Sequence, residues 1–249
     1  MRAVVLAAGR GSRLGDATRD RPKCLLRVAG RSLLDRQVAA LRAAGARDVG
    51  VVTGWQADAF AGTGLARWHN PHWARTTMVD TLAQADAWLR SGTTLVSYGD
   101  IVYSAATARR LAACGADLAV AYDPNWLPLW RRRFADPLDD AESFAVDADG
   151  RLTDIGGRPT SPDQVQGQYM GLLRFTPAGW REACRARDDG PPPEHLTDLL
   201  ARIVRAGRTE VAAVAAGEPW FEFDHPSDLR LGQEVVAALD AAERERDDT

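Results

Sequence analysis

Two hydrophobic patterns alternate along this chain: short apolar runs, and longer stretches with apolar residues at helical spacing. The first run, residues 3–8, is almost free of polar side chains, as expected of a strand buried on both faces of a parallel sheet. Further strands are predicted at residues 48–53, 65–70, 94–97, 117–122, 168–175, 210–215 and 220–223. Helices are predicted at residues 32–45, 76–89, 104–113, 177–187, 193–206 and 226–246. This alternation predicts an α/β fold, a Rossmann-like and mostly parallel sheet flanked by helices.

The alternation is interrupted between residues 124 and 167. Residues 143–147 and 151–155 flank a turn-forming Ala-Asp-Gly sequence, which predicts a β-hairpin. The interruption also contains two tryptophans and three consecutive arginines, Trp126, Trp130, Arg131, Arg132 and Arg133. We interpret it as a small lid inserted over the functional site of a single domain that spans residues 1–249.

A glycine-rich loop follows the first strand. Residues 9–15 hold three glycines and two arginines, and Pro22-Lys23 supplies a further cation nearby. Glycine permits positive φ, and consecutive backbone N–H groups in such a turn can bind an anion. The loop is not a Walker A motif, because Leu14 and Gly15 stand where glycine and lysine are required, and Leu14 also breaks the dinucleotide-binding pattern. The pattern predicts a polyphosphate site, and a solvated strand-to-helix turn is the alternative.

Acidic residues follow two of the predicted strands. Asp100 comes directly after the strand at residues 94–97, on the sheet edge where α/β proteins bind ligands. Such a carboxylate suits Mg²⁺ bound to a triphosphate, or it caps the next helix. Glu222 and Asp224 are two residues apart in a strand, so their side chains share one face. A bound cation would stabilise two neighbouring carboxylates; the alternative is that both are ordinary surface acids.

Composition argues against several classes of protein, among them nucleic-acid-binding, disulfide-rich and membrane proteins. The net charge of −3 gives no basic field for nucleic acid. The three cysteines lack a C-x-x-C pair, so neither a zinc site nor a disulfide framework is expected, and a reducing compartment fits them. No signal-peptide pattern or apolar run of membrane-spanning length is present. We therefore expect a cytoplasmic protein without nucleic-acid or membrane partners, and the sequence is compatible with a homodimer.

Several motifs together resemble one enzyme superfamily. Leu-Ala-Ala-Gly-x-Gly-x-Arg-Leu at residues 6–14 is followed in order by Pro22-Lys23, Asn70-Pro71, Tyr98-Gly99-Asp100 and Trp220-x-Glu-x-Asp224. This series resembles the sugar-phosphate nucleotidyltransferase superfamily over nearly the whole chain. It is most similar to the phosphocholine cytidylyltransferases and the cytidylyltransferases of phosphonate pathways.

The resemblance implies roles for individual residues. Lys23, Arg13 and Asp100 would be catalytic, and Asp100, Glu222 and Asp224 would hold Mg²⁺. The nucleotide would bind Leu6, Ala7, Ala8, Gly9, Gly11, Ser12, Arg13, Lys23, Thr76, Thr77, Thr81, Leu82, Tyr98 and Asp100. Guanidinium groups bind phosphonate oxygens, and carboxylates or aromatic faces bind an amine. We therefore assign the acceptor to Trp126, Trp130, Arg131, Arg132, Arg133, Glu142 and Tyr169, with a solvated lid surface as the alternative for the arginines.

The expected reaction transfers CMP from CTP to a small anionic acceptor, a phosphonate or a phosphate monoester, and releases pyrophosphate. Phosphonate natural-product biosynthesis is the expected setting. Three alternatives stay open: a nucleotide-sugar pyrophosphorylase acting on a sugar 1-phosphate, a phosphocholine cytidylyltransferase, and a nucleotide-binding regulatory protein that has lost catalysis.

Overall fold

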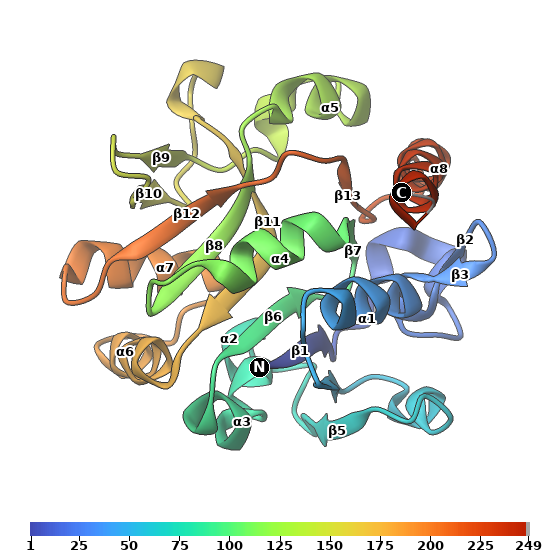
Figure 1. The fold of residues 1–249 in the computed structure, drawn as a ribbon, viewed down its shortest axis with the longest axis horizontal. Coiled ribbons are helices and arrows are strands. Elements are labelled where there is room, and N and C mark those ends of the chain that lie inside the picture. Colours follow the sequence, from blue (N-terminus) through green and yellow to red (C-terminus); the bar gives the residue numbers. More distant parts are fainter. Residues whose placement is uncertain (248–249) are drawn as a thin grey trace.

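A seven-stranded sheet forms the centre of the molecule, of which the computed structural model describes residues 1–247 (Figure 1). The strand order is β12-β8-β11-β6-β1-β4-β5. The strands are β1 (Arg2–Ala7), β4 (Asp48–Thr53), β5 (Ala66–His69), β6 (Thr94–Tyr98), β8 (Leu118–Asp123), β11 (Gln168–Phe175) and β12 (Val211–Ala215). Neighbours run parallel except β11, which is antiparallel to both β6 and β8. The predicted mostly parallel α/β sheet is confirmed.

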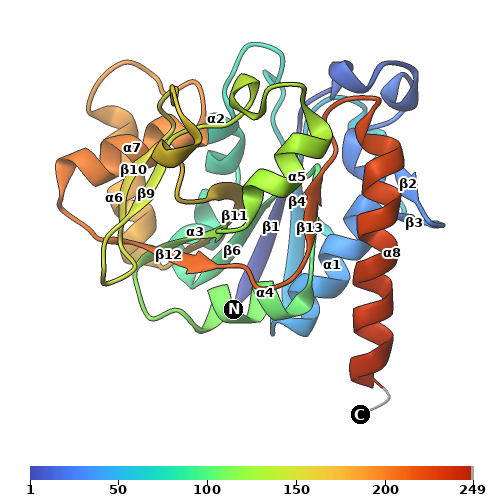
Figure 2. The same cartoon turned by 90° about the horizontal axis from the view of Figure 1, so that it is seen from above.

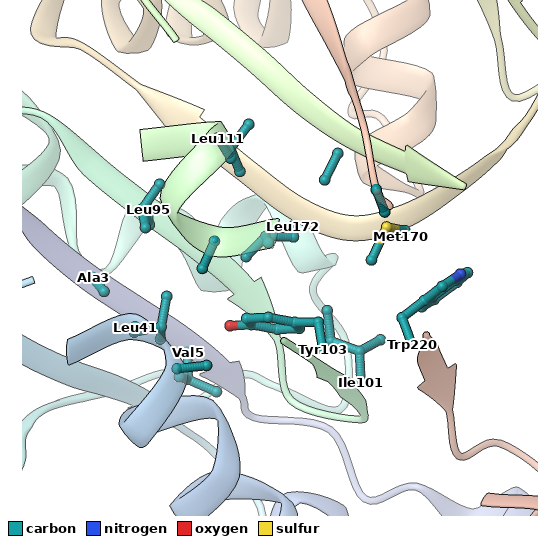
Figure 3. Close-up of a cluster of buried hydrophobic side chains, with 14 of the residues drawn as sticks. Ala3, Val5, Leu41, Leu95, Ile101, Tyr103, Leu111, Met170, Leu172 and Trp220 are labelled. Carbon is teal, nitrogen blue, oxygen red and sulfur yellow. The ribbon is translucent and has the colours of Figure 1, made fainter. Parts of the chain in front are cut away.

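Helices cover both faces because the central strands are apolar on both sides. In β1, Ala3 and Val5 face one buried cluster, and Val4 and Leu6 face the other. Figure 3 shows the first cluster, in which Leu41 lies beside Val5 and to which Leu111 also belongs. The helices on this side are α1 (Leu33–Ala43) and α4 (Ala105–Ala113). The opposite side carries α2 (Met78–Ala83), α3 (Asp86–Ser91), α6 (Pro177–Asp188) and α7 (Leu196–Ala206).

Two predicted helices differ from the observed ones. The helix expected at residues 76–89 is divided into α2 and α3, and α2 begins only after Thr77, whose hydroxyl caps it together with Asp80. The helix expected from residue 193 begins at Leu196, after a run of three prolines. There the backbone N–H of His195 donates to Asp198, which sets the start of α7.

Two-stranded sheets add to the central one. The predicted hairpin is confirmed as β9 (Phe144–Val146) and β10 (Leu152–Ile155), and β2 (Arg27–Val28) pairs with β3 (Arg31–Ser32). The predicted β13 (Trp220–Glu222) pairs with a strand not foreseen, β7 (Ile101–Tyr103), which follows Asp100 immediately. This pairing brings the last acidic motif of the chain to the end of β6.

Helix α5 (Trp126–Arg133) opens the insertion and was not predicted. Proline is tolerated in the first helical turn, where Pro128 lies. Helix α8 (Asp228–Asp247) runs along one side of the molecule, next to α1 and the β2–β3 pair (Figure 2). The 3₁₀ segments are Ser12–Thr18, Lys23–Leu25, Ala57–Phe60, Pro137–Asp139 and Pro162–Gln164. Within residues 1–247, no helix is both long and apolar enough to cross a membrane.

Candidate active site

The glycine loop after β1 is shaped around Lys23. Gly11 has φ +66°, a left-handed conformation that favours glycine. A Cβ atom at Gly11 would also lie 2.9 Å from the Cβ of Lys23. The carbonyl of Gly11 accepts hydrogen bonds from the Leu14 N–H at 3.2 Å and the Thr18 hydroxyl at 2.8 Å. The Lys23 side chain therefore packs directly on a loop held in one conformation.

Asp100 approaches the same loop through a tight turn. A Cβ atom at Gly99 would lie 2.5 Å from the carbonyl oxygen of Leu6, so only glycine lets the turn pass this close to β1. The buried Gln37 amide donates to the carbonyls of Tyr98 at 2.9 Å and Ile101 at 2.6 Å, which fixes both sides of the turn. Asp100 is thereby held at the carboxyl end of β6, beside the glycine loop.

Four charged residues from distant parts of the chain meet here. Lys23 Nζ lies 2.9 Å from Asp100 Oδ2 and also contacts Asp224 Oδ1. Arg13 Nη2 lies 2.7 Å from Asp224 Oδ2. The side chain of Asp224 is buried, whereas that of Arg13 is exposed and reaches in from the loop. The structure thus brings the predicted cations and carboxylates into one cluster.

Burial and charge set the protonation of this cluster. Burial alone would lower the pKa of Lys23, but the charges of Asp100 and Asp224 outweigh it, so the pKa is raised and the ammonium stays charged. Burial would raise the pKa of Asp224, but Lys23 and then Arg13 hold it below its usual value. Burial, followed by the charges of Asp100 and Asp224, raises the pKa of Glu222 to about 8. The cluster therefore favours a bound cation next to Glu222.

The three carboxylates fit a divalent cation. One oxygen each from Asp100, Glu222 and Asp224 lies within 4.8 Å of the others. Asp100 Oδ1 is buried and has no hydrogen-bond partner among the described residues. The β7–β13 register sets Glu222 opposite Ile101, and the Phe223 N–H donates to the Asp100 carbonyl at 2.9 Å. Carboxylate oxygens are the ligands that Mg²⁺ prefers, so this donor set suits it.

Two adjoining cavities open onto the cluster. The first, of about 300 Å³, is lined by the glycine loop together with Lys23. The second, of about 230 Å³, contains Glu222 and Asp224 and extends to Glu142 and Tyr169. The two cavities share Arg13, Met78, Tyr98 and Asp100. Their arrangement suits two substrates that meet at the cluster.

Most residues assigned to the nucleotide lie at the first cavity. It is lined by Leu6, Ala7, Gly9, Gly11, Ser12, Arg13, Lys23, Tyr98 and Asp100. Ala8 is buried beside it, and its carbonyl accepts from the Trp55 N–H at 2.9 Å.

The threonines assigned to the base pocket have structural partners. Thr76 and Thr81 accept hydrogen bonds from the buried Asn70 amide at 2.9 and 3.1 Å. Thr77 caps α2, and Leu82 is fully buried in the core. Among the described residues that line the two cavities, Met78 is the one from this segment.

Only part of the assigned acceptor set reaches the second cavity. Glu142 and Tyr169 line it. Trp126 and Trp130 are instead in the core, where their indole N–H groups donate to the Val165 carbonyl at 3.0 Å and to Asp140 Oδ2 at 3.1 Å. The amphipathic α5 turns both tryptophans inward, so we withdraw their assignment to the acceptor.

The three arginines also lie away from the expected acceptor site. Arg131 and Arg132 are exposed, and Arg132 pairs with Glu234 of α8 at 2.5 Å. Arg133 is buried and pairs with Asp228. All three lie outside the residues that line the described cavities, because α5 faces the core and α8 rather than the cavities.

Several residues that line the second cavity were not predicted from the sequence, among them Gln168, His195 and Thr197. Strict alternation along β11 would place Gln168 and Tyr169 on opposite faces. Both residues nevertheless line the second cavity, as do Met170 and Gly171, and the pairing with β8 shifts register just after them, between Tyr169 and Leu173, where Gly171 has φ +75°. The glycine after the Gln-Tyr-Met sequence was the available signal for this irregularity.

Comparison with known proteins places this geometry among nucleotidyltransferases. Residues 3–155 match the family model of the MobA-like NTP transferase domain. The chain is 32% identical over 252 residues to the CTP:phosphoglutamine cytidylyltransferase of Campylobacter jejuni, with 93% of this chain and 98% of that protein covered. It is 31% identical to the CMP-5'-(3-aminopropyl)phosphonate synthase of Streptomyces rubellomurinus, covering 92% of this chain but 38% of that protein.

Solved structures share the fold. The inositol-1-phosphate CTP transferase from T. maritima superposes with a TM-score of 0.77 at 19% identity, over 96% of this chain and 95% of that one. The CTP:phosphocholine cytidylyltransferase from Streptococcus pneumoniae superposes with a TM-score of 0.68 at 17% identity, over 94% and 98% of the two chains.

Proposed function

Because the chain belongs to the MobA-like NTP transferase family, and is therefore a nucleotidyltransferase, we propose that it transfers CMP from CTP to a small phosphonate or phosphate monoester. Pyrophosphate is the second product. Phosphonate natural-product biosynthesis is the proposed setting, by analogy with the phosphonate synthase of Streptomyces rubellomurinus. Cytosine is proposed from relatives whose names specify CTP or CMP.

One observation carries the proposal: two cavities meet at Arg13 and Asp100, next to Lys23. The nucleotide occupies the cavity of the glycine loop, and the acceptor occupies the cavity that reaches Glu142. An acceptor oxygen then attacks the α-phosphorus of CTP. A bond forms between them, the bond from the α-phosphorus to the bridging oxygen breaks, and pyrophosphate leaves with the electron pair.

The chain's residues act by positioning and by charge. The acceptor oxygen is already anionic, so no side chain is needed as a nucleophile or general base. The glycine-loop N–H groups bind triphosphate oxygens, and Lys23 and Arg13 neutralise charge that develops on the leaving pyrophosphate. The Lys23 ammonium stays protonated throughout because of its carboxylate neighbours.

Asp100, Glu222 and Asp224 would hold Mg²⁺. When bound, the ion neutralises phosphate charge and orients the triphosphate. The pKa of Glu222 is raised by burial and then by its acidic neighbours, so a cation at this position also stabilises its ionised form.

A panel assay of pyrophosphate release tests the proposal. CTP, UTP and dTTP are each combined with 2-aminoethylphosphonate, phosphocholine, inositol 1-phosphate and glucose 1-phosphate. We expect release with CTP and an alkyl phosphonate or phosphate monoester. Preference for UTP or dTTP with glucose 1-phosphate would identify a nucleotide-sugar pyrophosphorylase, and preference for phosphocholine a phosphocholine cytidylyltransferase. Nucleotide binding without release in any combination would favour a regulatory protein.

A further inference from the structure

A third cavity, of about 490 Å³, lies at the edge of the sheet opposite the glycine loop. Parallel strands begin at one edge, so the pairing of β1 with β4 sets Arg2 opposite Asp48 there. The antiparallel β11 ends at the same edge, where Arg174 lies opposite Leu95 of β6. The residues that line this cavity include Arg2, Arg47, Asp48, Thr93 and Arg174. Strand pairing thus brings three arginines from distant parts of the chain to one cavity.

Arg174 is a buried cation without a countercharge. It is 9% exposed, and it forms no ion pair with any of residues 1–247. Nη1 donates to the Ala116 carbonyl, and Nε is fully enclosed. Nη2 has no acceptor in the described part of the chain and, unlike Nε, keeps accessible surface, so it is the donor left for a molecule in the cavity. Burying an ionised guanidinium is costly unless an anion lies near it.

The other two arginines leave this cavity with an excess of positive charge. Arg2 Nε lies 3.9 Å from Asp48 Oδ2, and Arg2 Nη1 donates to the Ser91 hydroxyl. Arg47 is exposed and, within residues 1–247, has no carboxylate partner. Asp48 is the one carboxylate among the described residues that line the cavity. The charges of Arg47 and Arg174 are therefore left without compensation.

We propose that the third cavity binds a phosphate group, either as inorganic phosphate or as a phosphate monoester. Such a group carries about two negative charges near neutral pH, which matches the two uncompensated guanidiniums. Guanidinium donors also fit the geometry of phosphate oxygens. A single carboxylate would leave one of the two charges unpaired. The third cavity shares no lining residue with the two cavities of the candidate active site, so the inference does not depend on the proposed reaction.

Calorimetric titration with sodium phosphate tests the inference, with Mg²⁺ and an unreactive CTP analogue present to occupy the nucleotide cavity. Arg174→Met should weaken phosphate binding by about tenfold or more, because it removes a buried partner of the anion. Arg47→Ala should weaken it by about threefold or more, and its exposed position keeps the fold intact. Arg181→Ala is the matched control, since it removes the same charge from an exposed position on α6 outside the cavity lining, and should bind phosphate as the wild type does.

The three variants also separate the third cavity from the acceptor cavity, because phosphate bound beside Arg13 is left unchanged by all of them. The binding component lost in Arg174→Met and Arg47→Ala but kept in Arg181→Ala belongs to the third cavity. Unchanged phosphate binding by both Arg174→Met and Arg47→Ala would overturn the inference, as would a wild-type protein that binds no phosphate.

Thermal unfolding supplies a second measurement. Phosphate should raise the unfolding midpoint of the wild type more than sodium chloride of equal ionic strength does, and Arg47→Ala should reduce this difference. Equal effects of the two salts would indicate charge screening alone and would overturn the site. Titration with glycerol 2-phosphate distinguishes the two sources of the group: an ester that binds at least as tightly as inorganic phosphate supports a phosphate monoester as ligand, and weaker binding of the ester supports the free ion.

Discussion

Arg133 and Asp228 form a buried, two-pronged ion pair beside the carboxylate cluster. Arg133 Nε and Nη2 each lie 3.1 Å from an Asp228 oxygen, and the side chains are 1% and 2% exposed. Asp228 Oδ2 also accepts the backbone N–H groups of Asp224 and His225, both at 2.9 Å. Arg133 Nη1 lies 3.5 Å from Glu222 Oε2. The pair therefore connects α5 and α8 to the backbone that carries Glu222 and Asp224, two of the proposed Mg²⁺ ligands.

Arg133→Met should destabilise the fold strongly, because it leaves Asp228 buried without its partner. We expect a loss of about 3–5 kcal/mol in the free energy of unfolding, measured by urea denaturation. Arg132→Met is the matched control, since its ion pair with Glu234 is half exposed and should contribute less than about 1 kcal/mol. Equal stability of the two variants would contradict the role assigned to the buried pair.

Lys23→Ala should reduce turnover at saturating CTP by about a hundredfold or more, because it removes a positive charge that stabilises the transition state. Circular dichroism serves as the control for folding. A raised KM for CTP with an unchanged kcat would instead assign Lys23 to binding of the substrate in its ground state.

Asp100→Asn and Asp224→Asn should each abolish turnover while the protein remains folded, because each removes a charged ligand of the proposed Mg²⁺ site. Calorimetric titration with Mn²⁺ should show weakened metal binding in both variants. Near-normal activity of either variant at limiting Mg²⁺ would exclude that residue as a ligand.

Gly11→Ala should cost more stability than Gly9→Ala. Alanine at Gly11 must adopt φ +66° and would meet the Lys23 side chain, whereas a Cβ at Gly9 meets nothing within 4 Å. We expect a difference of about 1–2 kcal/mol in the free energy of unfolding by thermal or urea denaturation. Equal losses would mean that the loop can rearrange without strain.

The sequence predicted the parts of the site that are local in the chain. The glycine loop follows β1 directly, and Asp100 follows β6, so strand periodicity alone placed both at one edge of the sheet. The antiparallel direction of β11 could not be predicted in this way, because a strand buried on both faces has the same apolar pattern in either orientation.

The acceptor side depended on tertiary packing. Tryptophans beside arginines suggested an exposed lid, yet the apolar face of α5 fills the core and Arg133 is enclosed by packing against α8. Residues 168–171 all line the second cavity, and β11 is irregular between Tyr169 and Leu173, where Gly171 has φ +75°. The two tryptophans have a helical spacing of four residues, but that spacing does not show which surface the helix packs against, and a register shift in a strand leaves no periodic pattern.

The pairing of β7 with β13 joins residues more than a hundred positions apart, since Ile101 lies opposite Glu222. Contacts with so large a sequence separation form late, because the long intervening chain must first be ordered. Asp100 is made in the first half of the protein and remains without its acidic neighbours until the last strand docks. Metal affinity should consequently appear after the central sheet during refolding, so a ribosome-bound chain that ends before Trp220 would contain all seven strands of the central sheet but no complete cation site.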